Sequence, residues 1–195
     1  LRRDSRQGLK AALAACLAAG RSQDASPLLN RLALKAEEAG DLSRALALHF
    51  WDFRLSSDSH QAVGAAIPLG HIARLLVQSG LGTKGLAVQR RVINTLEKAG
   101  DTPAVKGELC SQRVSFCANA LTIIQGAGGK PFDEPLAQEA NKNLVEALRE
   151  EEAGAELPPG TNLKAELHRL HGLLCLEARD ATGALKNLEK ALAEN

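Results

Sequence analysis

Two histidines and a cysteine stand close together near the end of the sequence, in the stretch LHRLHGLLCLEARD at residues 167–180. His168, His171 and Cys175 are spaced so that an α-helix would present all three side chains on one face. Imidazole nitrogens and thiolates are the ligands that zinc prefers. A tetrahedral site needs a fourth ligand, however, and His168 and Cys175 lie about two helical turns apart. We therefore interpret the stretch as the packing face of a helix, keep zinc binding as the lesser alternative, and expect no cofactor.

A glycine-rich stretch is the second candidate for chemistry, because the backbone of such a loop can cradle a phosphate. GAGGKPFDEP, residues 126–135, contains the Gly–Lys pair of a phosphate-binding loop, but Pro131 follows Lys130 and Ile124 stands where the first glycine is required. We expect a connector between helices here. No Ser–His–Asp or Cys–His arrangement stands out elsewhere, so the chain is expected not to be an enzyme.

The composition indicates which elements carry these residues. Apolar residues make up 45% of the chain and aromatic residues only 3%, with no tyrosine or methionine. Alanine and leucine supply most of the apolar residues and favour helices, whereas the β-branched and aromatic residues that strands favour are scarce. The composition therefore predicts an all-α fold.

Charge and cysteine content limit the partners. The 24 basic and 23 acidic residues are interleaved and give a formal net charge of +1, which provides no reason to expect binding to nucleic acid or to an anionic membrane. Charged residues break the apolar stretches, so no membrane insertion is expected. The cysteines lie far apart in apolar helical contexts, and we interpret them as buried, reduced thiols of a cytoplasmic protein: Cys16, Cys110, Cys117 and Cys175.

Helix boundaries recur along the chain and predict about nine helices. In SPLLNRLALKAEEAG, Ser26 is the expected N-cap, Pro27 the first helical residue and Gly40 the end of the helix. Asp41 opens the next helix at once, so the two helices must fold back into an antiparallel hairpin. A similar pair of helices follows about 40 residues later, where Pro68 either begins a helix or kinks one.

The final hairpin, residues 161–195, resembles a tetratricopeptide repeat (TPR), a helix–turn–helix unit with small and large residues at fixed places. Its first helix has large, large, small and large residues at these places, and its second helix has small, large and small ones: His168, His171, Gly172, Cys175, Ala184, Leu188 and Ala191.

Two earlier hairpins, at 29–54 and 69–95, resemble the same unit through the small residues Ala33 and Ala73 of their first helices. The first of these hairpins departs from the family pattern in its second helix. His49 and Asp52 stand there at sites that usually hold an aromatic residue and an alanine: a bulky ring and a small side chain.

The resemblance implies one domain over residues 1–195, in which antiparallel hairpins stack as a short right-handed α-solenoid, with a possible sub-boundary near 126–135. A weaker resemblance covers residues 1–79, where SPLLNRL and DLSRALALH look like the small helical bundle shared by the COPII outer-coat subunit and steroid receptor RNA activator protein. It would imply a compact bundle for that segment instead of stacked hairpins.

In a TPR-like array the first helices of successive hairpins line a concave groove. The resemblance therefore implies a non-enzymatic protein–protein interaction scaffold that binds a partner peptide or helix in this groove. The repeat register places these residues on the groove: Asn30, Leu34, Glu37, Glu38, Arg74, Val77, Gln78, Arg169, Leu173 and Glu177. TPR domains that clamp a terminal carboxylate have an asparagine where this chain has Leu34 and Leu173, so binding of chaperone tails is not expected.

Two other functional classes stay open: a structural subunit of a larger permanent assembly, such as a coat or complex component, and, less favoured, a helical domain that senses a small molecule.

Two further segments allow both a structural and a functional interpretation. HFWDF, residues 49–53, contains the only tryptophan and two of the four phenylalanines. We expect Phe50 and Phe53, or Trp51, to fill the space between hairpins, and an exposed aromatic anchor is the alternative. Glu150 lies in an acidic cluster with Glu146 near an expected helix end, where we favour a solvated surface over a partner contact.

Overall fold

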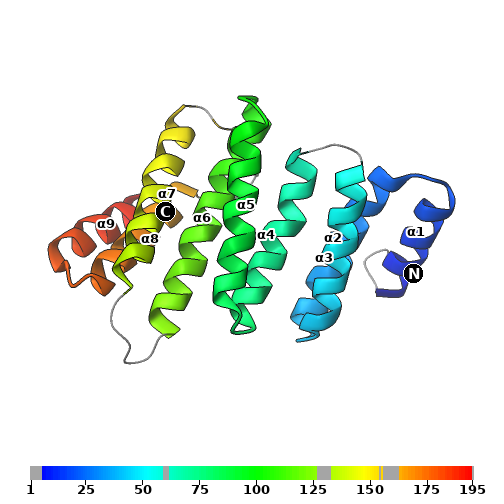
Figure 1. Ribbon diagram of the computed structural model, residues 1–195, viewed down its shortest axis with the longest axis horizontal. Helices are drawn as coiled ribbons and strands as arrows, with labels where there is room; N and C mark the ends of the chain where they lie inside the picture. Colours follow the sequence, from blue (N-terminus) through cyan, green and yellow to red (C-terminus); the bar gives the residue numbers. More distant parts are fainter. Residues whose placement is uncertain (1–5, 59–61, 127–132, 154, 156–162, 195) are drawn as a thin grey trace.

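The computed structural model describes residues 6–58, 62–126, 133–153, 155 and 163–194. Nine α-helices and no strand lie within these ranges, which confirms the predicted all-α class. In chain order (Figure 1) the helices are α1 (Arg6–Ala18), α2 (Ser22–Glu38), α3 (Leu42–Asp58), α4 (Ala62–Gln78), α5 (Gly82–Lys98), α6 (Pro103–Gly126), α7 (Glu134–Glu152), α8 (Leu163–Glu177) and α9 (Ala181–Ala193). Of the connector expected at 126–135, residues 127–132 lie outside the described residues, as does the cap expected at Thr161 or Asn162, while Gly126 ends α6 and α7 begins at Glu134.

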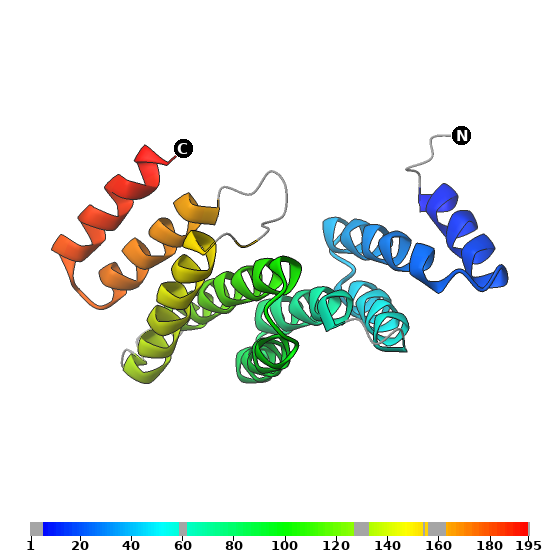
Figure 2. The same cartoon turned by 90° about the horizontal axis from the view of Figure 1, so that it is seen from above.

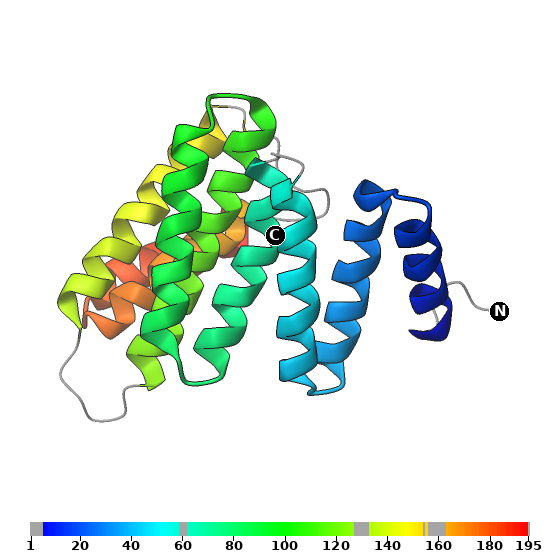
Figure 3. The ribbon, with the colours of Figure 1, turned by 45° about the vertical axis from the view of Figure 1, so that its right-hand side comes forward.

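Consecutive helices fold back on each other as antiparallel hairpins. α2 packs on α3, α4 on α5, α6 on α7 and α8 on α9, while contacts of α3 with α4 and of α5 with α6 join one hairpin to the next. The hairpins follow one another in a row from α1 to α9 (Figures 1 and 3). Figure 2 shows that this row is bowed, with α2 and α4 on its inner side and α3 and α5 on its outer side.

Local signals in the sequence set the turns between helices. Gly40 ends α2 with a φ of +73°, and the carboxylate of Asp41 accepts a hydrogen bond from the backbone N–H of Arg44 at 3.1 Å, so the predicted stop and cap are both confirmed. Gly80 ends α4 in the same conformation, with a φ of +79°. In the last hairpin this place is held by Arg179, whose φ of +61° is unusual for a residue with a side chain.

The start of α2 differs from the prediction. The helix begins at Ser22 rather than after Ser26, so Ser26 is not the N-cap and Pro27 lies inside the helix. Ala25, in the added turn, is fully buried, and α2 packs on α1. Burial of this turn outweighs the backbone hydrogen bond that Pro27 cannot donate. Pro68 likewise lies inside α4 and does not begin a helix.

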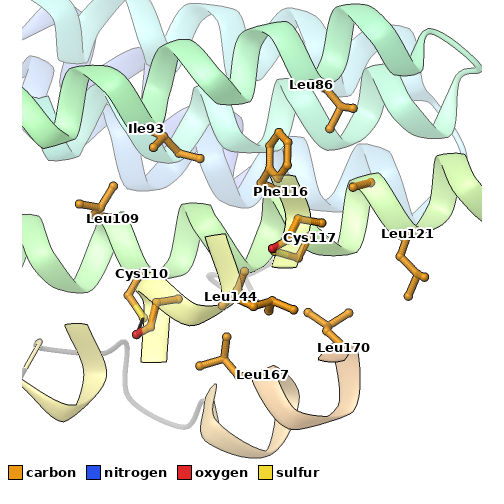
Figure 4. Close-up of a cluster of buried hydrophobic side chains, with 14 of the residues drawn as sticks. Leu86, Ile93, Leu109, Cys110, Phe116, Cys117, Leu121, Leu144, Leu167 and Leu170 are labelled. Atoms are coloured by element: carbon orange, nitrogen blue, oxygen red, sulfur yellow. Dashed lines mark hydrogen bonds between the residues drawn. The ribbon is translucent and has the colours of Figure 1, made fainter. Parts of the chain in front are cut away.

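The main hydrophobic core lies among α4, α5, α6, α7 and α8, with Phe116 of α6 fully buried at its centre (Figure 4). Cys110 and Cys117, also on α6, are fully buried, and their thiols donate to the carbonyl oxygens of Ala147 and Ala140 on α7. Burial raises the pKa of the Cys110 thiol to about 12, so it stays protonated and unreactive near neutral pH. The predicted burial of these two cysteines is thus confirmed.

Small residues bring the two helices of a hairpin close together. A Cβ atom added to Gly85 of α5 would lie 2.6 Å from the carbonyl oxygen of Ala73 on α4. In the last hairpin, a Cβ atom added to Gly172 would lie 2.8 Å from the side chain of Leu188. These contacts explain why small residues recur once per hairpin, because any larger side chain would force the helices apart.

Within the described ranges, no helix is both long enough and apolar enough to cross a membrane.

Candidate functional site

The groove residues predicted from the repeat register lie on α2, α4 and α8. Leu34, Glu38 and Gln78 are exposed, and Arg74 is half-buried between them and the core. We call the surface formed by these four residues the inner face, since α2 and α4 lie on the inner side of the bow. Val77, which the register also placed on the groove, is buried and takes part in packing instead.

An ion pair joins the inner face across two hairpins. The guanidinium of Arg74 on α4 donates to the carboxylate of Glu37 on α2 at 2.5 Å. The candidates on α8 are not part of this arrangement, because Arg169 pairs with Glu166 of its own helix and Glu177 accepts a hydrogen bond from Gln125 of α6 at 3.1 Å. Figure 1 shows α8 near the other end of the row.

A buried cluster of two histidines lies directly behind this ion pair. His49 of α3 is fully buried, and its Nε2 forms a hydrogen bond with the other carboxylate oxygen of Glu37 at 2.9 Å. The ring of His71 on α4 stacks on that of His49, with centroids 4.6 Å apart and planes 10° apart. Arg74 also approaches Nδ1 of His71 at 3.4 Å, so four polar side chains from three helices form one network.

The cluster favours a fixed set of charges. Burial, together with the neighbouring His49 and Arg74, lowers the pKa of His71 to about 4, so His71 is neutral near pH 7. Burial raises the pKa of Glu37, but the hydrogen bonds from Arg74 and His49 outweigh it and hold the pKa below its ordinary value. Burial raises the pKa of the neighbouring Asp52 carboxyl, against a hydrogen bond from Ser26 and the nearby His49.

These residues also form the one group in the described part of the chain that has the composition of a metal site. Ligand atoms of Glu37, His49 and His71 lie within 4.8 Å of one another. The stacked rings argue against a shared ion, because each imidazole directs its nitrogen lone pairs within its own plane and the two planes are nearly parallel. Arg74 adds a positive charge on the remaining oxygen of Glu37. The arrangement fits a polar joint between hairpins better than a metal centre.

The sequence trio His168, His171 and Cys175 does not converge in the same way. Among the described side chains it forms no group with ligand atoms within 4.8 Å of one another. All three side chains are half-buried toward α9, whereas the residues of α8 that enter the main core are leucines one position earlier: Leu167, Leu170 and Leu174. The trio therefore provides only part of the packing expected of it, and the contacts of α8 with the main core are made by these three leucines, which the repeat register did not identify.

A second feature that the sequence did not reveal is a groove on the outer side of the bow, between α3, α4 and α5. Its volume is about 570 Å³, and its lining is largely apolar: Phe53, Ser57, Ala62, Ala65, Ala66, Leu69, Val88, Arg91, Val92 and Thr95. We call it the outer groove. Phe53 enters its wall, but Phe50 and Trp51 are exposed, so the expectation of ring packing between hairpins is wrong for Phe50 and for Trp51.

Arg113 of α6 is the centre of a third polar cluster. It is almost fully buried and pairs with Glu97 of α5 at 2.8 Å, and with Glu146 of α7 at 2.9 Å and Glu150. The expected solvated surface at Glu146 and Glu150 is therefore wrong for these two residues. Burial raises the pKa of Glu150, although the adjacent Arg113 opposes the shift.

One sequence signal could have identified the histidine cluster. His49 and Asp52 stood at repeat sites that usually hold apolar residues, and both side chains are buried in the structure. A polar residue at a packing site must find a polar partner, and here the partners came from α2 and α4. Comparison of this chain with protein-family models and with curated proteins finds no match.

Proposed function

We propose that this chain is a non-enzymatic protein–protein interaction scaffold. In this proposal its hairpins form a short TPR-like, right-handed α-solenoid, and a peptide or helix of a partner protein lies on the inner face. We also propose a cytoplasmic location, because the cysteines are all free and mostly buried: Cys16, Cys110, Cys117 and Cys175.

One observation carries the proposal: the Glu37–Arg74 ion pair links α2 of one hairpin to α4 of the next on the inner side of the bow. Leu34 and Glu38 of one hairpin and Gln78 of the next are left exposed next to it. A surface with an apolar side chain beside polar ones matches the mixture found in recognition sites. The ion pair itself is used within the chain, so it positions the surface and leaves contact with a partner to its exposed neighbours.

Affinity capture with matched variants tests the proposal. The bait is the full chain, carrying Leu34→Glu with Gln78→Glu in one variant and Leu81→Glu with Thr83→Glu in the control. Leu81 and Thr83 are exposed where the chain passes from α4 to α5, so their substitution adds the same two negative charges outside the inner face. We expect the inner-face variant to lose partners that wild type and the control both retain. Equal recovery by all three baits would contradict the inner-face assignment.

A second candidate function, a structural subunit of a permanent assembly, is favoured by the outer surface of α9. Leu185 and Leu192 are 62% and 76% exposed. Counted from the small residue at the hairpin contact, their equivalents on α5 are Leu86 and Ile93, which are 4% and 7% exposed in the main core. The surface that a following helix covers on α5 is thus open on α9.

Light scattering across a concentration series tests this second candidate. A subunit that assembles through α9 should gain mass with concentration, and Leu185→Lys with Leu192→Lys should abolish the gain. A mass that stays monomeric at every concentration would argue against assembly of this chain with itself through α9.

A further inference from the structure

The outer groove can be compared with a second groove of the same construction. Both lie where a helix of one hairpin faces the two helices of the next, first α3 with α4 and α5, then α5 with α6 and α7, where the groove consists of two cavities that share Glu97. The close contacts within hairpins supply the register: Ala73 and Gly85 meet between α4 and α5, as Cys117 and Ala140 meet between α6 and α7. Position by position, the lining residues of one groove can then be assigned to those of the other.

In the second groove, one long side chain crosses the space, and two smaller cavities of about 320 and 300 Å³ remain. Arg113 enters it from α6 and meets Glu97 from α5 and Glu146 and Glu150 from α7. Leu109, one turn before Arg113, packs into the core beside it. A cation paired with carboxylates thus occupies the part of this groove between the two smaller cavities, and Arg90 and Glu139 add an ion pair of 2.6 Å across its rim.

In the outer groove, a leucine replaces the central arginine, and two hydroxyl residues and one arginine replace the three glutamates. Leu69 of α4 stands at the position of Arg113, and Ala65 at the position of Leu109. The three carboxylates are replaced by Ser57, Thr95 and Arg91. The groove is therefore open and apolar, because its central side chain is shorter and Ala65 contributes only a methyl group.

The charge of the outer groove is also the reverse of its counterpart. Arg91 is exposed on the α5 wall, where α7 has Glu146. No described carboxylate lies within ion-pair distance of the Arg91 guanidinium, whereas Arg90, the preceding residue, is fully engaged with Glu139. The remaining polar groups of the lining are the hydroxyls of Ser57 and Thr95, and that of Thr95 already donates to the Arg91 carbonyl oxygen at 2.8 Å. A ligand of this groove must therefore offer apolar surface and a negative charge.

We propose that the outer groove binds an acidic amphipathic helix of another protein. Its apolar side chains lie against Leu69 and Val92, and one of its carboxylates accepts hydrogen bonds from the guanidinium of Arg91. The lining extends over about two helical turns of α4 and α5, which matches the apolar stripe of a short helix. Beyond the groove, the exposed ring of Phe50 lies 6.4 Å from that of Phe53 and extends the apolar surface along the helix axis.

A labelled peptide titrated with the full chain tests this proposal. The probe is a fluorescein-labelled peptide of about 12 residues, or three helical turns, with leucines at helical spacing and glutamates elsewhere. Its counterpart has lysine at every glutamate position. We expect fluorescence anisotropy to show binding of the acidic peptide, and binding of the lysine peptide that is weaker by about tenfold or more.

Three variants locate the binding. Arg91→Glu should weaken binding of the acidic peptide by about tenfold or more, while Lys84→Glu, an equal charge change on an exposed residue of the same helix, should change it by less than about twofold. Ala65→Leu fills the groove as Leu109 fills its counterpart and should weaken binding without any change of charge. Circular dichroism shows whether each variant is folded. Because Arg91 is exposed, the comparison of Arg91→Glu with Lys84→Glu remains valid even if Ala65→Leu destabilises the chain.

Several outcomes would overturn the proposal. Equal losses from Arg91→Glu and Lys84→Glu would show general charge attraction and no groove. If the acidic peptide does not bind and dodecanoate binds to wild type but not to the Arg91→Glu variant, the groove is a site for small amphiphiles. Self-association of the chain that Ala65→Leu abolishes would identify the occupant as a second copy. The inner face lies on the opposite side of the bow, so its variants should leave peptide binding unchanged.

Discussion

Acidification should destabilise the fold through His71, whose pKa is lowered to about 4 by burial between α3 and α4 and by the neighbouring His49 and Arg74. Above pH 6.5 the imidazole is neutral in both the folded and the unfolded chain. Below that pH the unfolded chain takes up a proton that the folded chain does not, so the free energy of unfolding falls as the pH falls toward 4. The stability is therefore lost on the acid side of neutrality.

The size of the effect follows from the two pKa values. With 6.5 in the unfolded chain and about 4 in the folded chain, the free energy of unfolding decreases by about 2 kcal/mol between pH 7 and pH 5. Glu37 acts in the same direction, since its pKa is held below its ordinary value of 4.5, but its contribution is lost only at lower pH. Between pH 7 and pH 5, His171 acts in the same direction, since burial also lowers its pKa, whereas Asp52 and Glu150 act in the opposite direction, since burial raises their pKa values. The contribution of His71 is therefore measured with a variant that lacks this ring.

Urea unfolding followed by circular dichroism at pH 7 and pH 5 measures this loss. His71→Phe keeps a flat ring against His49 and removes the titrating group. The free energy of unfolding of this variant should therefore change less between pH 7 and pH 5 than that of wild type, by about 2 kcal/mol. His171→Phe removes the half-buried imidazole of α8 whose pKa burial also lowers, and so measures the part of the pH dependence that does not come from this junction. An undiminished pH dependence in His71→Phe would refute the assignment to this junction.

Three further predictions concern stability and reactivity. Arg113→Leu leaves three glutamates without their shared cation and should lower the free energy of unfolding by about 2–3 kcal/mol. The loss is smaller than for a fully buried pair because the carboxylates reach water. A loss below about 1 kcal/mol in denaturant titration would contradict this prediction. Arg179→Gly relieves a positive φ and should raise the stability by about 1 kcal/mol, and a lower melting temperature would count against it. Cys110 and Cys117 should react with a thiol reagent at pH 8 only when the chain is unfolded, and rapid labelling in the absence of denaturant would show that α6 is not buried as described.

The secondary structure could be predicted from sequence because its signals are local. A glycine followed by aspartate, as at Gly40 and Asp41, stops one helix and caps the next within a few residues. The exception at Pro27 shows the limit of this reasoning. Whether the turn before the proline is helical depends on packing that buries Ala25, and no residue near Pro27 reports that packing.

The candidate sites depend on distances between hairpins, which periodicity within a helix does not encode. His49 and His71 lie in helices that pack together only when two hairpins are placed side by side. The sequence showed that His49 departed from the repeat pattern, but it could not show which ring or carboxylate would satisfy it. The outer groove likewise exists because Leu69 and Ala65 are short relative to their counterparts, and that comparison needs the register of three helices at once.

The inner-face assignment is tested most directly by photo-crosslinking. A benzophenone amino acid is placed at Leu34 or Gln78, which are exposed on the inner face, and at Lys98, which is exposed at the end of α5. Mass spectrometry of the cross-linked peptides then identifies what lies against each position in the full chain. The account predicts that Leu34 and Gln78 cross-link to one segment of the same partner protein and that Lys98 does not. Cross-links to that partner from Lys98 alone, or from all three positions equally, would contradict it.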